Sequence, residues 1–172
     1  MKKENLGKRY GIGFSYIAMA LILFVLFWGL SFTGIGAFTG IYGAFKMIFP
    51  LVVAISIAAG IGFDHSGASA LAGAVGYLVF GASFSVLIDP KIPFLVTTPI
   101  KLFGSMGSDQ FFFILCGFMM GIVAGALYNK FYNIKLPEWL AFFGGRRFVP
   151  IITSIVALFI GSFIANVIIP HL

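Results

Sequence analysis

The sequence predicts an all-α, polytopic membrane protein with about five transmembrane helices and a cytoplasmic N-terminus. Of the 172 residues, 60% are hydrophobic and only 9% are charged, whereas a soluble domain carries roughly 25% charged residues. Five apolar runs are close to the length that crosses a bilayer. The basic residues gather at the ends of these runs, where they act as topology signals. The net charge of +6 therefore does not indicate nucleic-acid binding.

The first predicted span covers residues 12–31 and is rich in Ile, Leu and Phe. It lacks a clear small-x-small cleavage site, which favours a retained span over a signal peptide. The glycine-rich segment 32–45 follows. In it, Gly36 and Gly40 have the small-xxx-small spacing that lets helices approach closely, but a loop or a short interfacial helix fits the same residues equally well.

The second predicted span runs from 46 to 62. Pro50 is expected in its first two turns, where the missing N–H costs least. The polar run 63–67 then breaks the apolar pattern. Either Asp64 or Ser66 has the side chain of a helix N-cap for the span that follows.

The third predicted span covers 67–88, and small residues, among them Gly73 and Gly76, recur along it. A helix with so little side-chain bulk is expected to pack against protein rather than lipid. Three prolines in residues 89–107 are incompatible with a helix, so this segment is predicted to be an extended outer loop.

The fourth predicted span covers 109–128, with Ser108 and Asp109 as its N-terminal caps. Three of its glycines recur every fourth residue and are expected to form one smooth helix-packing groove. These glycines are Gly117, Gly121 and Gly125. A helix–helix contact is favoured over a ligand contact for this groove.

The segment 133–150 combines basic, aromatic, glycine and proline residues between two apolar runs, which is typical of an interfacial loop. Lys135, Arg146 and Arg147 carry its positive charge, and the fifth predicted span, 149–169, follows it. With the N-terminus inside, eight Lys and Arg residues lie on the cytoplasmic side and three on the outer side, in agreement with the positive-inside rule.

The sequence contains no nucleotide-binding loop, metal-ligand cluster or nucleophile–base pair, so no catalytic residue, metal or cofactor is predicted. His65 could serve as a phosphoacceptor or proton relay, but a polar residue in a solvated turn is favoured. Asp64 beside it could pair with a cytoplasmic basic residue, although exposed pairs of this kind contribute little. Cys116 is expected to be inert and buried. Asn166 is a candidate for a helix–helix hydrogen bond. Ionisable groups are expected only near the ends of the spans, whereas a transporter normally keeps such groups at its substrate site. The sequence therefore predicts a scaffold, and it identifies no substrate-binding residues.

Three stretches carry a family resemblance: residues 70–79, residues 121–137 with Lys-Leu-Pro at their end, and Phe-Phe-Gly-Gly-Arg-Arg-Phe-Val-Pro-Ile at 142–151. They resemble the membrane component, enzyme IIC, of the bacterial sugar phosphotransferase system, in its glucose branch and nearest to the N-acetylglucosamine permeases. The resemblance covers about 61–172. Residues 1–45 lack the Pro-rich first helix that is usual in this family.

The resemblance implies a ten-span inner-membrane (plasma-membrane) protein, dimeric through its first five spans, that moves a hexose such as N-acetylglucosamine or glucose inward. A IIB component would phosphorylate the sugar from a phosphocysteine charged by IIA. In the family, the sugar site lies in the second half, with a histidine and a Gly-x-Thr-Glu-Pro motif that this chain lacks. Residues 1–172 would thus be the N-terminal half of an enzyme IIC domain, with a scaffold and dimerisation role. The chain would come from a split or truncated gene or be a fragment of a longer protein. It would need a C-terminal IIC half.

Three alternatives stay open at this stage. Arg146 and Arg147 could attract an acidic IIB surface or the phosphoryl group, or could only set topology and bind lipid phosphates. The chain could instead be a five-span scaffold or regulatory protein without transport activity. Self-association through the Gly117–Gly125 face could also form an autonomous channel, an interpretation that rests on glycine spacing alone.

Overall fold

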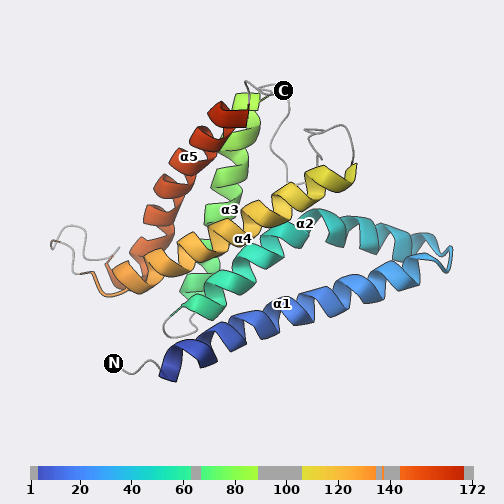
Figure 1. Ribbon diagram of the computed structural model, residues 1–172, viewed down its shortest axis with the longest axis horizontal. Coiled ribbons are helices and arrows are strands. Elements are labelled where there is room, and N and C mark those ends of the chain that lie inside the picture. The colour runs from blue at the N-terminus through green and yellow to red at the C-terminus, as the bar shows by residue number, and fades with distance from the viewer. Residues whose placement is uncertain (1–3, 63–66, 89–105, 135–136, 138–143, 169–172) are drawn as a thin grey trace.

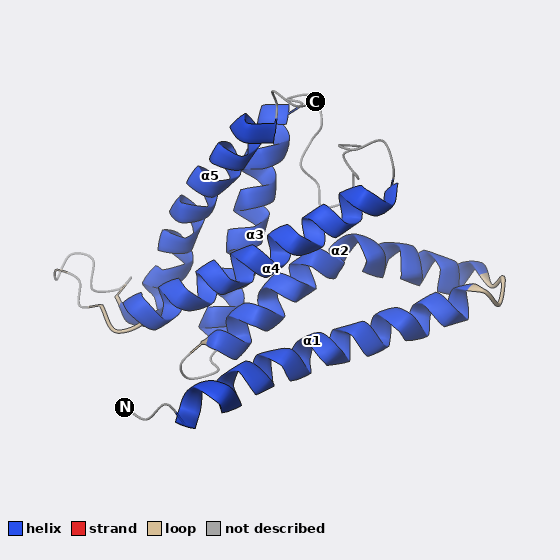
Figure 2. Cartoon of the chain, viewed as in Figure 1, coloured by secondary structure: helices blue, strands red, loops and turns tan. Residues whose placement is uncertain are grey.

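The computed structural model describes residues 4–62, 67–88, 106–134, 137 and 144–168, and side chains are described for most of these. Every regular element among these residues is a helix (Figure 2). The elements are α1 (Glu4–Ser31), α2 (Gly36–Ile61), α3 (Gly67–Ile88), α4 (Met106–Phe131), the 3-10 turn η2 (Gly145–Arg147) and α5 (Phe148–Ile168).

Each of the five α-helices contains a segment long and apolar enough to cross a membrane. The longest such segment has 26 residues, which corresponds to about 39 Å of helix at ~1.5 Å per residue and exceeds the ~30 Å hydrocarbon core. The prediction of an all-α, polytopic protein with about five spans is therefore confirmed. The cytoplasmic position of the N-terminus stays a prediction.

Helices α1 and α4 both begin earlier than the apolar pattern predicts. Helix α1 starts at Glu4 rather than at residue 12, because its polar first turns are helical too. Helix α4 starts at Met106, so Ser108 and Asp109 lie inside its first turn and the prediction that they cap it is wrong. An acidic residue is favourable anywhere in the first turn of a helix because of the helix dipole. Asp109 therefore marks the beginning of α4 without being its cap.

Helix α2 differs most from the prediction, because it begins at Gly36 instead of at residue 46. The segment 32–45 is therefore mostly helix, and Pro50 lies in the helix interior rather than in its first turns. A proline there leaves the carbonyl four residues earlier, that of Lys46, without its intrahelical donor. Figure 1 shows the bend in α2 that such a residue produces.

The early start of α2 also changes the position of Lys46. Its side chain is half-buried and lies ten residues inside an apolar helix. The expectation that ionisable residues occur only near span ends is therefore wrong at this position.

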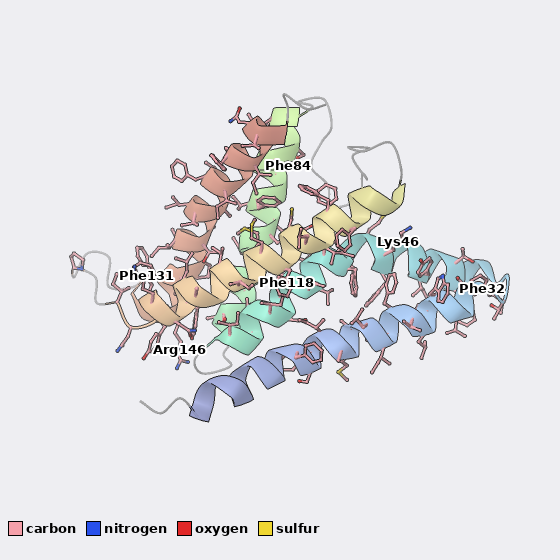
Figure 3. All side chains as sticks on the ribbon, viewed as in Figure 1. Phe32, Lys46, Phe84, Phe118, Phe131 and Arg146 are labelled. Atoms are coloured by element: carbon pink, nitrogen blue, oxygen red, sulfur yellow. The ribbon has the colours of Figure 1, made fainter. Side chains whose placement is uncertain are left out.

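The helices pack in two groups, as Figure 1 shows: α1 lies along α2, and α3 lies beside α5, with α4 between the groups. Phe24 of α1 fills the space under the bend of α2, with ring-centroid distances of 5.0 Å to Phe49 and 5.6 Å to Tyr42. Phe80 and Met120 are fully buried in the core between α3, α4 and α5. Many large apolar side chains on α1 and α5 point outward (Figure 3), as expected for surfaces that face lipid.

Candidate functional site

The glycine row of α4 packs closely against α2. A Cβ atom added at Gly117 would collide with the carbonyl oxygen of Pro50 and lie 3.0 Å from its carbonyl carbon. A Cβ atom at Gly121 would lie 2.8 Å from the oxygen of Ala54, and one at Gly125 would lie 2.7 Å from Cβ of Ile61. Successive glycines of α4 thus contact successive turns of α2, and the two helices run parallel. Only glycine permits this separation between the two backbones.

Small residues of α3 make the second set of close contacts. A Cβ atom added at Gly73 would lie 2.6 Å from Cβ of Ala58 in α2, and one at Gly76 would lie 2.8 Å from Cγ2 of Thr153 in α5. Thr153 is fully buried, and its hydroxyl donates to the carbonyl of Val149 at 2.8 Å. Helix α3 therefore joins α2 and α5.

Gly161 of α5 makes a contact that the sequence analysis missed. A Cβ atom there would lie 2.7 Å from the carbonyl oxygen of Phe80 and would collide with the hydroxyl of Ser83. Gly161 is the one glycine in the sequence of α5. A lone glycine in an otherwise bulky span was the available signal, but it lacks the four-residue repeat that marks the row of α4.

A polar junction closes the C-terminal end of α2. The last carbonyls of a helix lack intrahelical donors. Here the carbonyl of Ala58 accepts from the hydroxyl of Ser69, from α3, as well as from the N–H of Gly62 at 2.9 Å, and Nδ2 of Asn129, from α4, donates to the carbonyl of Ile61 at 2.9 Å. The Oδ1 atom of Asn129 is buried and has no hydrogen-bond partner. Side chains of two helices thus stabilise the end of a third.

The turn between α4 and α5 carries exposed positive charge. Gly145 has φ +67°, a conformation that favours glycine, and its N–H donates to the carbonyl of Ile134 at 3.1 Å. This bond fixes η2 beside the chain that leaves α4. We call Lys130, Arg146 and Arg147 the basic junction, since all three are exposed and lie at the ends of α4 and of the turn that it contacts. Figure 3 shows Arg146 and Phe131 at the same end of the molecule.

Several predicted residues lie outside this description. Lys135, Asp64 and His65 are not among the described residues, and neither is the greater part of the predicted outer loop, 89–105. The last two residues of that predicted loop, 106–107, belong to α4.

The described residues contain no obvious reactive centre. Cys116 is 5% exposed and packs in the core with Tyr77 and Met120. The amide of Asn166 donates to the carbonyl of Ser162 in its own helix at 2.9 Å, so the predicted helix–helix hydrogen bond is wrong. In the part of the chain that the structure describes, no group of three His, Cys, Asp or Glu side chains could hold a metal ion.

Five apolar helices held together by glycine contacts define a multi-pass integral membrane protein. More specifically, the sequence matches the family described as "Phosphotransferase system, EIIC" over residues 11–172. The chain therefore belongs to this family, and its location is the inner membrane. The resemblance inferred from the sequence is confirmed.

Curated relatives extend this assignment. The chain is 41% identical over 112 residues to the "PTS system N-acetylglucosamine-specific EIICBA component" of Escherichia coli (strain K12), covering 65% of this chain and 14% of that protein. It is 39% identical over 113 residues to the N-acetylglucosamine-specific EIICB component of Bacillus subtilis (strain 168), covering 66% and 21%. It is 38% identical over 125 residues to the glucoside-specific EIICBA component of Staphylococcus carnosus (strain TM300), covering 65% and 18%. The matched stretch thus spans about a fifth or less of each relative.

Proposed function

We propose that the chain is a component of a phosphoenolpyruvate-dependent sugar phosphotransferase transporter, which takes up a hexose with coupled phosphorylation. The observation that carries this proposal is the family match over residues 11–172. N-acetylglucosamine is the sugar we favour, with glucose second, because two of the relatives are named as N-acetylglucosamine-specific.

Within that transporter, residues 1–172 act as the N-terminal scaffold half of the IIC domain. The glycine contacts of α4 with α2 support this role, because backbones this close resist relative movement of the two helices. The composition of the spans also supports it. A sugar site needs several convergent polar groups, whereas the buried side chains of the described helices are mainly Ala, Phe, Val and Tyr, with four Ser and Thr.

The partners follow from the same proposal. A C-terminal IIC half would supply the sugar site, because the sequence of this chain has no Gly-x-Thr-Glu-Pro motif. Soluble IIB and IIA components would deliver the phosphoryl group, and the letters in the relatives' names, EIICBA and EIICB, agree with such an assembly. A second copy of the chain would complete a homodimer within the bilayer.

The test is sugar uptake with phosphorylation in cells that lack their own permease, with this chain alone and together with a matching C-terminal half. Uptake that requires both parts supports the proposal. Uptake with the chain alone would place the sugar site in these five helices and overturn the scaffold role. No uptake in either arrangement, with both proteins present in the membrane, would favour the alternative of a five-span scaffold or regulator without transport activity.

A matched pair of variants shows whether the scaffold matters to any uptake observed. Gly117→Leu places a bulky side chain against the backbone of Pro50, whereas Gly29→Leu introduces the same side chain where no atom lies within 4 Å of the Cβ position. Uptake should be lost in the first variant and retained in the second. Equal uptake in both would contradict the scaffold role.

A further inference from the structure

Helix α2 changes its surroundings at Pro50. None of residues 36–48, all of which the structure describes, is buried, whereas eight residues between Phe49 and Gly60 are buried. Pro50 lies at this boundary and lacks the N–H that would join its turn of the helix to the turn before. Figure 1 shows the bend of α2 in this region. The helix thus has an exposed part and an enclosed part, and one backbone hydrogen bond is missing between them.

Glycine contacts fix the enclosed part. A Cβ atom at Gly117 of α4 would lie 3.0 Å from the carbonyl carbon of Pro50, and one at Gly121 would lie 2.8 Å from the carbonyl oxygen of Ala54. A Cβ atom at Gly73 of α3 would lie 2.8 Å from the same oxygen. Backbone atoms this close cannot move aside by a side-chain rotation. After Pro50, α2 is therefore held by α3 and α4.

The exposed part of α2 is held more loosely. The glycines of this part, Gly36, Gly40 and Gly43, have no atom within 4 Å of their Cβ positions. Its described ring contacts are with α1, where Phe27 lies 6.0 Å from Phe45 between ring centroids. Aromatic rings pack favourably in several geometries, so such contacts tolerate a tilt of the helices. We call residues 21–31 of α1 and 36–49 of α2 the arm.

Helix α1 is compatible with a tilt of the arm. Among its described side chains, residues 14–31, Ala20 alone is buried. Ala20 packs in one cluster with Phe49 and Val53, beside the bend of α2. One methyl group makes a small contact, about which a helix can tilt while little buried area is lost. The two helices of the arm therefore pivot at the same level.

We propose that Pro50 is a hinge and that the angle of the arm follows the thickness of the bilayer. The apolar segment of α2 has 26 residues, against 18 to 23 in the other four helices as far as they are described. At ~1.5 Å per residue it is about 39 Å long, roughly 9 Å longer than the ~30 Å hydrocarbon core. Long apolar segments relieve such a mismatch by tilting or kinking. Because the enclosed part is fixed, the arm takes up the difference, whether or not the chain belongs to a sugar transporter.

The expected movement is large enough to measure. Thr39 follows the start of α2 by one turn and precedes Pro50 by eleven residues. At ~1.5 Å per residue this is about 16 Å of helix, so a change of ~20° in the bend displaces Thr39 by roughly 6 Å.

The test is double electron–electron resonance on the full chain in lipid nanodiscs. Spin labels are attached to introduced cysteines after Cys116→Ala, and labelled chains are diluted with unlabelled ones. Thr39→Cys is paired with Leu71→Cys and, separately, with Ile122→Cys. Leu71→Cys with Phe163→Cys is the control pair, from α3 to α5. All four labelled positions are exposed.

Lipids of different chain length supply the perturbation. Between dimyristoyl and dieicosenoyl phosphatidylcholine, we expect the arm distances to shift by several ångströms and the control distance to stay constant. Constant arm distances would overturn the proposal. Equal shifts in the arm and control pairs would also overturn it, because the whole helix bundle would then deform.

A matched pair of variants tests the hinge residue. Pro50→Ala restores the missing N–H, so the arm distances should no longer respond to the lipid. Gly43→Ala changes an arm position with open space around its Cβ atom and should keep the response of the wild type. A full response in Pro50→Ala, with helix content unchanged by circular dichroism, would overturn the hinge. If Pro50→Ala does not fold, the wild-type comparison of arm and control pairs still decides the question.

Discussion

Gly117→Ala tests the contact between the glycine row of α4 and helix α2 with the smallest possible change. The three atoms nearest to the added methyl group are the carbonyl oxygen, the carbonyl carbon and the Cα of Pro50, and the last two lie at 3.0 and 3.3 Å. All three are backbone atoms of a buried residue, so no side-chain rotation relieves the collision. The helices must move apart along the row, which also weakens the contacts of Gly121.

The expected magnitude follows from two opposing effects. Overpacking a well-packed core typically costs ~1–3 kcal/mol. Replacing Gly by Ala inside a helix contributes up to ~1 kcal/mol of stability through helix propensity. With the full propensity gain we therefore expect a net loss of about 0–2 kcal/mol in the free energy of unfolding relative to the wild type, which lowers the folded-to-unfolded ratio by up to roughly 30-fold. For a chain of this size, each 1 kcal/mol corresponds to roughly 2–4 °C in Tm.

The assay is unfolding of the purified chain in mixed micelles by added SDS, followed by circular dichroism. Gly40→Ala is the matched control, because no atom lies within 4 Å of its Cβ position. Gly125→Ala should fall between the two, because its nearest neighbours are side-chain atoms of Ile61 at 2.7 and 2.8 Å. If Gly117→Ala unfolds at the same SDS fraction as Gly40→Ala, the backbones of α2 and α4 are not in contact in the folded protein and the reasoning fails.

Three further predictions concern other parts of the helix packing. Gly161→Ala should destabilise the chain by about 1–3 kcal/mol because its Cβ would lie 2.7 Å from the oxygen of Phe80, and SDS unfolding equal to that of Gly29→Ala would contradict this. Ser69→Ala should cost less than about 1 kcal/mol in the same assay, because the carbonyl of Ala58 keeps the N–H of Gly62 as a donor at 2.9 Å; a larger loss would refute the argument. Cys116, only 5% exposed, should resist a hydrophilic maleimide in the folded chain and react after denaturation, and fast labelling in micelles would show that the core is open.

The positions of the spans were predictable because apolar runs near 20 residues are a strong signal. The third span, predicted at 67–88, has those bounds in the structure, and the fifth differs by one residue at each end. The start of α2 was not predictable in the same way. Glycine and proline lower helix propensity in water, so Gly36 and Gly40 suggested a loop and Pro50 suggested a helix start. In an apolar environment, the need to satisfy backbone hydrogen bonds outweighs these preferences.

Glycine spacing alone did not tell which glycines would be buried. Gly36 and Gly40 have the same four-residue interval as Gly117 and Gly121, yet the first pair has open space at its Cβ positions and the second pair contacts a helix backbone. The difference comes from the neighbouring helix rather than from the glycines. Ring contacts of Phe24 with Tyr42 and Phe45 hold α1 against α2 at centroid distances of 5.6 and 6.4 Å.

The bend of α2 connects these two kinds of contact. Before Pro50, α2 is separated from α1 by aromatic rings, and after Pro50 it is in backbone contact with α4 through the glycine row. Gly117 contacts the carbonyl of Pro50 itself, so the two kinds of contact meet at this residue. Lys46 lies one turn before this point, where the missing N–H of Pro50 leaves a carbonyl without its helical donor. The charge of Lys46 and the bend at Pro50 therefore lie within one turn of α2.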